Sequence, residues 1–285
     1  MIKLIASDMD GTLVSTDHAI SEANASAIKR AQNKGIEFII TTGRSYEDAY
    51  PQVVAAGIEC NYLVMNGSEL RNPKGEIIQS LYLTRTLVEQ TVAELTQAGM
   101  YVELYTTGGT FSPSDAESRK WAVATKINNF HPLISIDEAY QSAEDHFLYK
   151  GINCIDSLER IFENGYEVGK IISFSHRRDK IAELRATLPQ KYPVNVTGSF
   201  AINLEITNPL ADKGEAIKHY AAGRGIPTAA IMTIGDSYND LGMLGDMFGY
   251  TVAMGNAIDE VKQQAKYITD TNDADGVGKA IERFV

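Results

Sequence analysis

Short apolar runs alternate with amphipathic helical segments at both ends of the chain. Residues 2–6 and 36–40 are two such runs, and a segment with apolar residues at helical spacing lies between them. A strand, a helix and a second strand within about forty residues predict a βαβ unit with a right-handed crossover. The alternation returns after residue 212, with apolar runs at 229–234 and 250–254. The pattern predicts an α/β fold built on a doubly wound parallel sheet.

The middle of the chain has a different character. Between residues 84 and 209, helical segments are mixed with runs in which apolar and polar residues alternate, such as 101–105 and 201–206. Alternating strands are half exposed, as in an antiparallel sheet that helices cover on one face. The sequence therefore predicts a core domain of residues 1–83 and 210–285, interrupted by an inserted α+β domain at 84–209.

Two local patterns in the inserted segment make specific predictions. Thr86 and Glu89 have the spacing of a capping box at the start of a helix that Gly99 ends. Residues 106–115 are rich in Gly, Ser and Thr and predict a loop.

Length, charge and cysteine content limit the class of protein. The 285 residues suffice for two domains, and the net charge of −11 argues against non-specific binding to nucleic acid or to an anionic membrane. An anionic substrate stays possible, because a bound metal can locally reverse the field. The two cysteines form no CxxC motif, and no apolar stretch has the length of a membrane span or a signal peptide. We expect a cytoplasmic protein of unknown oligomeric state.

Two acids follow the first apolar run. Asp8 and Asp10 come directly after a predicted strand, where an open α/β sheet binds its ligands. Two neighbouring carboxylates repel each other unless a positive or reactive group lies between them. The structural alternative is a solvated loop with a turn at Gly11.

Other predicted strand ends and helix starts also have polar groups. They are Thr42, Gly43, Lys213, Asp236, Asn239 and Asp240. Several have a structural alternative: a helix N-cap for Thr42-Gly43, a surface lysine for Lys213, and, for Asp236 and Asp240, a strand-to-helix turn with a capping box at Ser237. Because parallel strands place their carboxyl ends on one edge of the sheet, we expect all of these groups in one crevice.

The residue types indicate phosphoryl chemistry. Oxygen ligands with no nearby His or Cys suit Mg²⁺, and a carboxylate can be a nucleophile that forms an aspartyl-phosphate. Lys213 and the N–H groups after Thr42 could hold a phosphate. A second carboxylate two residues from the nucleophile can protonate the leaving oxygen and then activate water. A calcium loop does not fit, because the spacing from Asp236 would need Gly at Leu241 and Glu at Met247.

Four segments together resemble the motifs of the haloacid dehalogenase superfamily. They are Asp8-Met9-Asp10-Gly11-Thr12-Leu13, Thr42-Gly43-Arg44, Lys213-Gly214 and Gly235-Asp236-Ser237-Tyr238-Asn239-Asp240. The insertion before the third motif, and Asn66-Gly67 after the third predicted strand, resemble the Cof-type branch (subfamily IIB) of sugar-phosphate phosphatases. The resemblance spans the whole chain and implies a Rossmann-like core with a C2-type cap. Met9, where Leu or Ile is usual, and Asp212, where a small polar residue is common, depart from the pattern without removing a chemical group.

The resemblance also implies a role for the residues around the phosphoryl group. Asp8 would be the nucleophile, and Asp10 would be the general acid/base, with its backbone carbonyl on Mg²⁺. Thr42 and the amide of Gly43 would hold the phosphoryl group. Lys213 would neutralise Asp8 and the phosphate.

The remaining motif residues would complete the metal site. Asp236 would ligate Mg²⁺ beside Asp8 and Asp10, and Asp240 would orient the metal shell. Asn239 would position Lys213 or the phosphate. Arg44 has two open interpretations, a substrate contact or a salt bridge at the crevice.

The predicted function is a Mg²⁺-dependent phosphatase that hydrolyses a small phosphorylated metabolite, such as a sugar phosphate, through an aspartyl-phosphate. Asp10 favours phosphate chemistry, since relatives that cleave carbon–halogen bonds resemble this chain but lack that acid. One alternative is a phosphomutase, which uses the same core and returns the phosphoryl group to a sugar. A phospho-accepting signalling module is disfavoured by the large insertion and by the motif that ends at Asp240.

Overall fold

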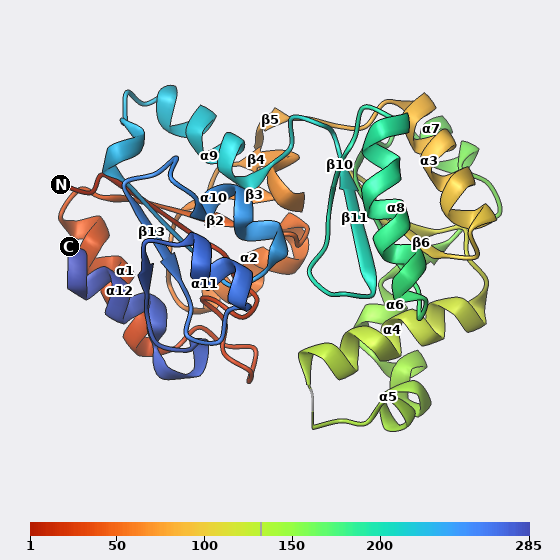
Figure 1. Cartoon of the computed structure of the whole chain (residues 1–285), viewed down its shortest axis with the longest axis horizontal. Coiled ribbons are helices and arrows are strands. Elements are labelled where there is room, and N and C mark those ends of the chain that lie inside the picture. The colour runs from red at the N-terminus through yellow and green to blue at the C-terminus, as the bar shows by residue number, and fades with distance from the viewer. Residues whose placement is uncertain (132) are drawn as a thin grey trace. The chain divides into compact units, whose positions relative to one another are not determined.

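The computed structural model describes residues 1–131 and 133–285, which form two compact units (Figure 1). We name them the core unit, Met1–Leu81 with Leu210–Val285, and the inserted unit, Tyr82–Pro209. The core unit is thus assembled from two segments that are distant in the sequence. Among the described residues, no helix combines the length and the apolar character needed to cross a membrane.

The core unit is built on an eight-stranded sheet in the order β14-β13-β12-β1-β2-β3-β4-β5. The strands from β14 to β3 are parallel, and β4 and β5 add an antiparallel hairpin at one edge. The prediction of a doubly wound parallel sheet is confirmed. The strands are β1 Leu4–Ser7, β2 Glu37–Thr41, β3 Asn61–Val64, β4 Glu69–Arg71, β5 Ile77–Ser80, β12 Ile231–Gly235, β13 Tyr250–Ala253 and β14 Tyr267–Ile268.

Burial of whole strands explains why the core runs are continuously apolar. All residues of β1 and β12 are buried, because parallel sheets of this type are covered on both faces. The helices are α1 Glu22–Asn33, α2 Tyr46–Ala55, α9 Lys213–Ala222, α10 Leu241–Leu244, α11 Asp259–Gln264 and α12 Gly276–Phe284, with 3₁₀ turns η1 Met65–Gly67, η3 Thr228–Ala230, η4 Tyr238–Asp240 and η5 Asn272–Ala274.

Capping side chains determine where the core helices begin. The hydroxyl of Ser21 accepts a hydrogen bond from the backbone N–H of Asn24 at the start of α1. At α9, the Asp212 carboxylate accepts from the N–H groups of Gly214 and Glu215. Asp212 therefore makes Lys213 the first residue of α9, next to the carboxyl ends of the strands.

The inserted unit contains a six-stranded sheet in the order β10-β11-β9-β6-β7-β8. All neighbours are antiparallel except β7 and β8, so the predicted α+β architecture is confirmed. The strands are β6 Tyr101–Thr106, β7 Gly109–Ser112, β8 Ile152–Cys154, β9 Val168–Phe174, β10 Asn195–Thr197 and β11 Asn203–Thr207; the helices are α3 Arg85–Gln97, α4 Ala116–Phe130, α5 Ile136–Ser142, α6 Phe147–Lys150, α7 Glu159–Glu163 and α8 Arg178–Lys191, with a 3₁₀ turn η2 Ala143–Asp145.

Two local predictions in the inserted unit are wrong. Helix α3 begins after Thr84, whose hydroxyl accepts from the N–H of Leu87, and Glu89 pairs with Arg85 instead of capping. The segment 106–115 contains strand β7, because Thr106 closes a tight turn by accepting from the N–H of Gly108 and lets the chain pair back on β6.

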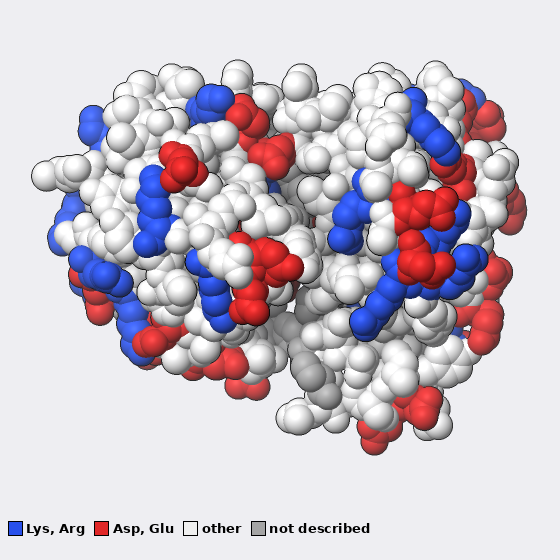
Figure 2. All heavy atoms as spheres, in the orientation of Figure 1, with Lys and Arg blue, Asp and Glu red and all other residues white. Residues whose placement is uncertain are grey.

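Charged side chains of both signs are interspersed on the face of each unit that Figure 2 shows. Exposed ion pairs occur in both units, such as Lys180 with Glu183 and Lys279 with Asp270. Exposed pairs of this kind contribute little to stability, so they keep the surface hydrated without determining the fold.

Candidate active site

Asp8, the first acid, lies at the carboxyl end of the central strand β1 of the core sheet. Asp8 follows β1, and its N–H donates to the carbonyl of Ile234 on the neighbouring strand β12 at 3.0 Å. Asp236 follows β12, so the two acids leave adjacent parallel strands at the same edge. The alignment of β1 with β12 thereby brings together residues that are more than two hundred positions apart in the sequence.

Lys213 lies between two of the acids. Its ammonium Nζ is 2.8 Å from Oδ1 of Asp8 and 2.6 Å from Oδ1 of Asp240. Lys213, Asp8 and Asp240 are all buried, and carboxylate oxygens of Asp8, Asp236 and Asp240 lie within 4.8 Å of one another. We name these four residues the acid cluster. It has three carboxylates and one ammonium, so its negative charge is in excess.

Burial and mutual repulsion change the protonation of the acid cluster. Burial raises the pKa of Asp8 to about 7, with a further contribution from the Asp240 carboxylate, although Lys213 acts to lower it. Burial also raises the pKa of Asp236 well above its ordinary value. Burial acts to lower the pKa of Lys213, but Asp240 and Asp8 outweigh it and raise that pKa. The ammonium of Lys213 therefore stays charged, but its single positive charge does not balance three carboxylates.

The donor set of the acid cluster fits a hard divalent cation. Asp8, Asp236 and Asp240 offer only oxygen atoms, which Mg²⁺ prefers. Burial and the excess negative charge together raise the pKa of Asp8 and Asp236, and a cation would offset that charge.

Asp240 is both a cap and a member of the acid cluster. Its Oδ2 accepts from the N–H groups of Asp236 and Ser237, at 2.9 and 3.0 Å, which completes a capping box. Its Oδ1 accepts from Lys213. The two oxygens have different tasks, so the capping interpretation and the site interpretation are compatible.

Gly11 allows the first loop to approach Asp236. It has a φ of +73°, and a Cβ atom there would lie 2.5 Å from Oδ2 of Asp236. The next residue, Thr12, donates its hydroxyl to Oδ1 of Asp236 at 2.7 Å. Only glycine therefore fits at position 11 without moving Asp236.

Thr42 and Gly43 follow β2 at the same edge of the sheet. Thr42 is buried, and its N–H donates to the carbonyl of Leu63. Its hydroxyl accepts from the N–H of Arg44 at 3.2 Å, and its carbonyl accepts from the N–H of Asn66 at 2.9 Å. The backbone after β2 is thus held from two sides.

The turn that contacts Thr42 has an unusual backbone. Met65, Asn66 and Gly67 have φ values of 50°, 58° and 94°. Consecutive left-handed residues with side chains cost about 1–2 kcal/mol each, and such strain is concentrated at functional sites. The sequence indicates a turn at Asn66-Gly67 but not the left-handed Met65.

Asn239 and Asp10 make contacts outside the acid cluster. The Asn239 amide donates to Oδ1 of Asn66 at 3.4 Å, and its carbonyl accepts from the hydroxyl of Ser237 at 2.7 Å. The half-exposed Asp10 carboxylate accepts two hydrogen bonds from the guanidinium of Arg44. Of the two interpretations of Arg44, the structure shows the salt bridge.

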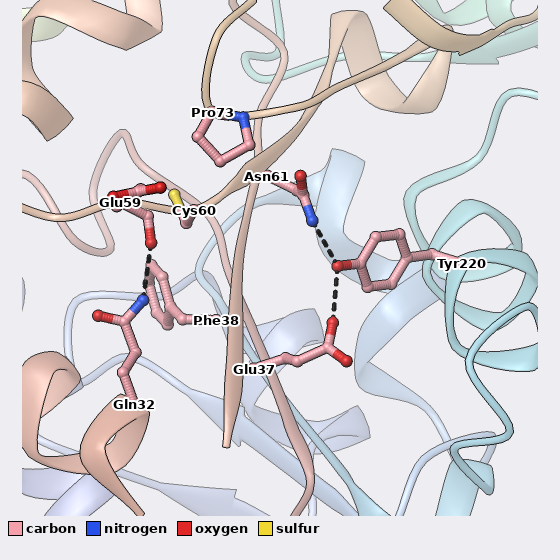
Figure 3. Close-up of a pocket in the computed structure, with 8 residues that line it drawn as sticks. All are labelled: Gln32, Glu37, Phe38, Glu59, Cys60, Asn61, Pro73 and Tyr220. Carbon is pink, nitrogen blue, oxygen red and sulfur yellow. Dashed lines mark hydrogen bonds between the residues drawn. The ribbon is translucent and has the colours of Figure 1, made fainter. Parts of the chain in front are cut away.

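A cavity of about 390 Å³ lies at the amino ends of β2 and β3, away from these strand ends (Figure 3). Its polar groups bind one another: Asn61 donates to the hydroxyl of Tyr220, which donates to Glu37. Cys60 also lines this cavity, and burial raises the pKa of its thiol to about 12.

A parallel α/β sheet with acids and a lysine at its carboxyl edge defines a class of phosphoryl-transfer enzymes, and sequence comparison agrees. The chain belongs to the haloacid dehalogenase-like hydrolase family, whose model matches residues 5–281. It is a phosphoric monoester hydrolase of this superfamily.

Two curated relatives and one solved structure are similar to this chain over almost their whole length. The chain is 32% identical, over 100% of its length and 98% of the relative, to the 5-amino-6-(5-phospho-D-ribitylamino)uracil phosphatase YwtE of Bacillus subtilis. It is 28% identical to phosphatase YwpJ of the same organism, with full coverage of both chains. The structure of a haloacid dehalogenase-like hydrolase from B. subtilis superposes with a TM-score of 0.88 at 28% identity, covering 100% of both chains.

Proposed function

We propose that the protein is a Mg²⁺-dependent phosphatase that hydrolyses a small phosphorylated metabolite through an aspartyl-phosphate on Asp8. The main support is the buried contact of 2.8 Å between Nζ of Lys213 and Oδ1 of Asp8, in a cluster with excess negative charge. A carboxylate beside an ammonium is kept available as a nucleophile. Bound Mg²⁺ would supply positive charge that offsets the acids and polarises the phosphoryl group.

The proposed reaction has two steps. In the first, an oxygen of Asp8 bonds to phosphorus, the ester P–O bond breaks, and Asp10 gives its proton to the leaving oxygen. In the second, Asp10 takes a proton from water, the water oxygen bonds to phosphorus, and the bond to Asp8 breaks. Lys213, Thr42 and the Gly43 amide hold the phosphoryl oxygens throughout.

The proposed substrates are phosphorylated sugars or sugar alcohols. Two relatives, at 32% and 29% identity, are named for a phosphorylated ribityl compound, which places a phosphate on a polyol chain. We further propose that residues 84–209 act as the C2-type cap that selects among these substrates, and that the enzyme works in the cytoplasm. The two unpaired cysteines support a reducing compartment.

A substrate panel tests the proposal. We expect phosphate release, dependent on Mg²⁺ and abolished by EDTA, from p-nitrophenyl phosphate, hexose phosphates, pentitol phosphates and 5-amino-6-(5-phospho-D-ribitylamino)uracil. Asp8→Asn should lower turnover by about 10⁴-fold or more with the fold intact, because it removes the nucleophile. Asp259→Asn, at an exposed position of α11, is the matched control and should keep full activity.

Two outcomes would contradict the proposal. Near-normal turnover by Asp8→Asn would exclude a covalent mechanism at this residue. Isomerised sugar phosphate in place of free phosphate would make the enzyme a phosphomutase.

A further inference from the structure

We propose that Arg44 is a positioning residue that holds the Asp10 carboxylate, and that it does not bind the substrate phosphoryl group. This inference rests on the acid/base role proposed for Asp10. Arg44 is the third residue of the segment Thr42-Gly43-Arg44, whose first two members are proposed to hold the phosphoryl group. A cation at that position is an obvious phosphate ligand, so its contacts decide between the two roles.

The guanidinium of Arg44 donates a hydrogen bond to each carboxylate oxygen of Asp10. Its Nε is 2.8 Å from Oδ2, and its Nη2 is 2.5 Å from Oδ1. Such a bidentate pair fixes the plane of a carboxylate as well as its distance, because the donors of the guanidinium form a rigid fork.

The remaining end of the guanidinium is attached to α2. Nη1 of Arg44 donates to Oε1 of Gln52 at 2.8 Å and to the carbonyl of Asp48 at 3.2 Å. Gln52 in turn donates to the carbonyl of His18 at 3.0 Å. Helix α2 therefore holds the guanidinium and also the loop that follows Asp10.

The backbone of Arg44 is fixed as well. Its N–H donates to the hydroxyl of Thr42, and its carbonyl accepts from the N–H of Met65 at 2.8 Å. Only 18% of the Arg44 side chain is exposed, so a rotation toward a bound anion would break several contacts at once.

Electrostatics favours the same assignment. Burial acts to lower the pKa of Arg44, but the hydrogen bonds and charge of Asp10 outweigh it and raise that pKa. A substrate phosphate would have to displace Asp10 to bind this cation. While Asp10 is ionised the pair is neutral as a whole, so it attracts a phosphoryl group less than a lone cation would.

Positioning of a general acid has a chemical signature. The alkoxide of a sugar is a poor leaving group and needs a proton as the P–O bond breaks, whereas p-nitrophenolate leaves without one. Displacement of Asp10 by about 1 Å would slow proton transfer by roughly 10²-fold. Loss of Arg44 should therefore affect sugar phosphates more than p-nitrophenyl phosphate.

The experiment compares kcat/KM for the two kinds of substrate, because this ratio reports only the steps up to departure of the leaving group. For Arg44→Gln we expect a fall of about 10²-fold with glucose 6-phosphate and of less than about 10-fold with p-nitrophenyl phosphate. Asp10→Asn should show the same selectivity, and the double variant should be no worse than Asp10→Asn alone. Arg44→Lys, which keeps the charge but not the fork, should be intermediate.

A matched control is Arg224→Gln. Arg224 also pairs with a carboxylate, that of Glu37, but at the amino end of β2. This variant should leave both kcat/KM values unchanged. Thermal unfolding of every variant establishes that the folded enzyme is being compared, and Arg44→Lys serves if Arg44→Gln does not fold.

Three results would overturn the inference. Equal losses on both substrates, with a raised KM, would make Arg44 a phosphate ligand. Losses that add to those of Asp10→Asn would show that Arg44 acts independently of Asp10. If Asp10→Asn itself affected both substrates equally while Asp8→Asn stayed inactive, the acid role of Asp10 would fall, and this inference with it, but the covalent mechanism would stand.

Discussion

Buried ion pairs of the inserted unit are balanced in charge, whereas the acid cluster of the core unit is not. In the inserted unit, Lys126 binds both oxygens of Glu103, at 2.7 and 2.6 Å, and Lys170 lies 3.1 Å from Glu205. Each of these carboxylates is matched by one ammonium. The acid cluster of the core unit has three carboxylates for the single ammonium of Lys213.

The buried carboxylates of the inserted unit also accept hydrogen bonds from hydroxyl groups. Glu103 also accepts from the hydroxyl of Tyr101 at 2.7 Å, and Glu205 accepts from the hydroxyl of Ser199 at 2.6 Å. In these pairs each charge has an opposite charge and further hydrogen bonds as partners. Buried ion pairs need such partners if they are not to destabilise a fold. In the acid cluster, burial and the mutual repulsion of the carboxylates raise the pKa of Asp8 and Asp236, as expected of a site that binds a positive partner.

The largest expected difference concerns stability. Glu103→Gln leaves the Lys126 ammonium buried without its carboxylate, so we expect the free energy of unfolding of the inserted unit to fall by about 3–5 kcal/mol. Asp236→Asn removes one of three repelling charges, so in EDTA the core unit should be as stable as the wild type or more stable. Urea unfolding measures both, with fluorescence of the single tryptophan, Trp121, reporting on the inserted unit.

Activity should respond in the opposite way. Asp236→Asn should be inactive, and the Glu103→Gln protein that remains folded should keep its turnover of p-nitrophenyl phosphate. A loss of stability on Asp236→Asn without metal would show that the acid cluster is a structural network like the pairs of the inserted unit, and the contrast would disappear.

A smaller effect is expected from pH. The pKa of Asp8 is about 7 in the folded protein and has its ordinary value of 3.8 when unfolded. Between these values the folded state binds more protons than the unfolded state, so metal-free stability should fall as pH rises from 3.8 to about 7. The raised pKa of Asp236 acts in the same direction.

Thermal unfolding in EDTA across this pH range provides the measurement. Asp8→Asn should show a shallower decline than the wild type, because it removes one titrating group. A wild-type protein that becomes more stable toward neutral pH, relative to Asp8→Asn, would mean that Asp8 is stabilised in its charged form without any cation.

Much of the core unit could be predicted because its causes are local. Continuous apolar runs indicate doubly buried strands, and Ser21 and Asp212 lie where a helix needs a cap. The meeting of Asp8 with Asp236 follows from a general property of parallel sheets. The roles proposed for these acids came from the motifs and stay proposals until they are tested.

Features that depend on tertiary contacts could not be predicted. A left-handed Met65 has no local cause, since its conformation is imposed by hydrogen bonds to the backbone after β2. The pairing of Arg44 with Asp10 depends on how α2 packs, which leaves its side chain open to two interpretations in the sequence. Strand β7 is rich in turn-forming residues and becomes a strand only because β6 and β8 lie on either side of it.

The central claim is that the unbalanced acid cluster forms a covalent bond to phosphorus, and a trapping experiment tests it directly. The enzyme is mixed with Mg²⁺ and p-nitrophenyl phosphate, quenched in acid during turnover, and mapped by peptide mass spectrometry. We predict one phosphoryl group on the peptide that contains Asp8, removable by hydroxylamine and absent from Asp8→Asn. A phosphoryl group on any other residue, or continued turnover by Asp8→Asn, would contradict the account.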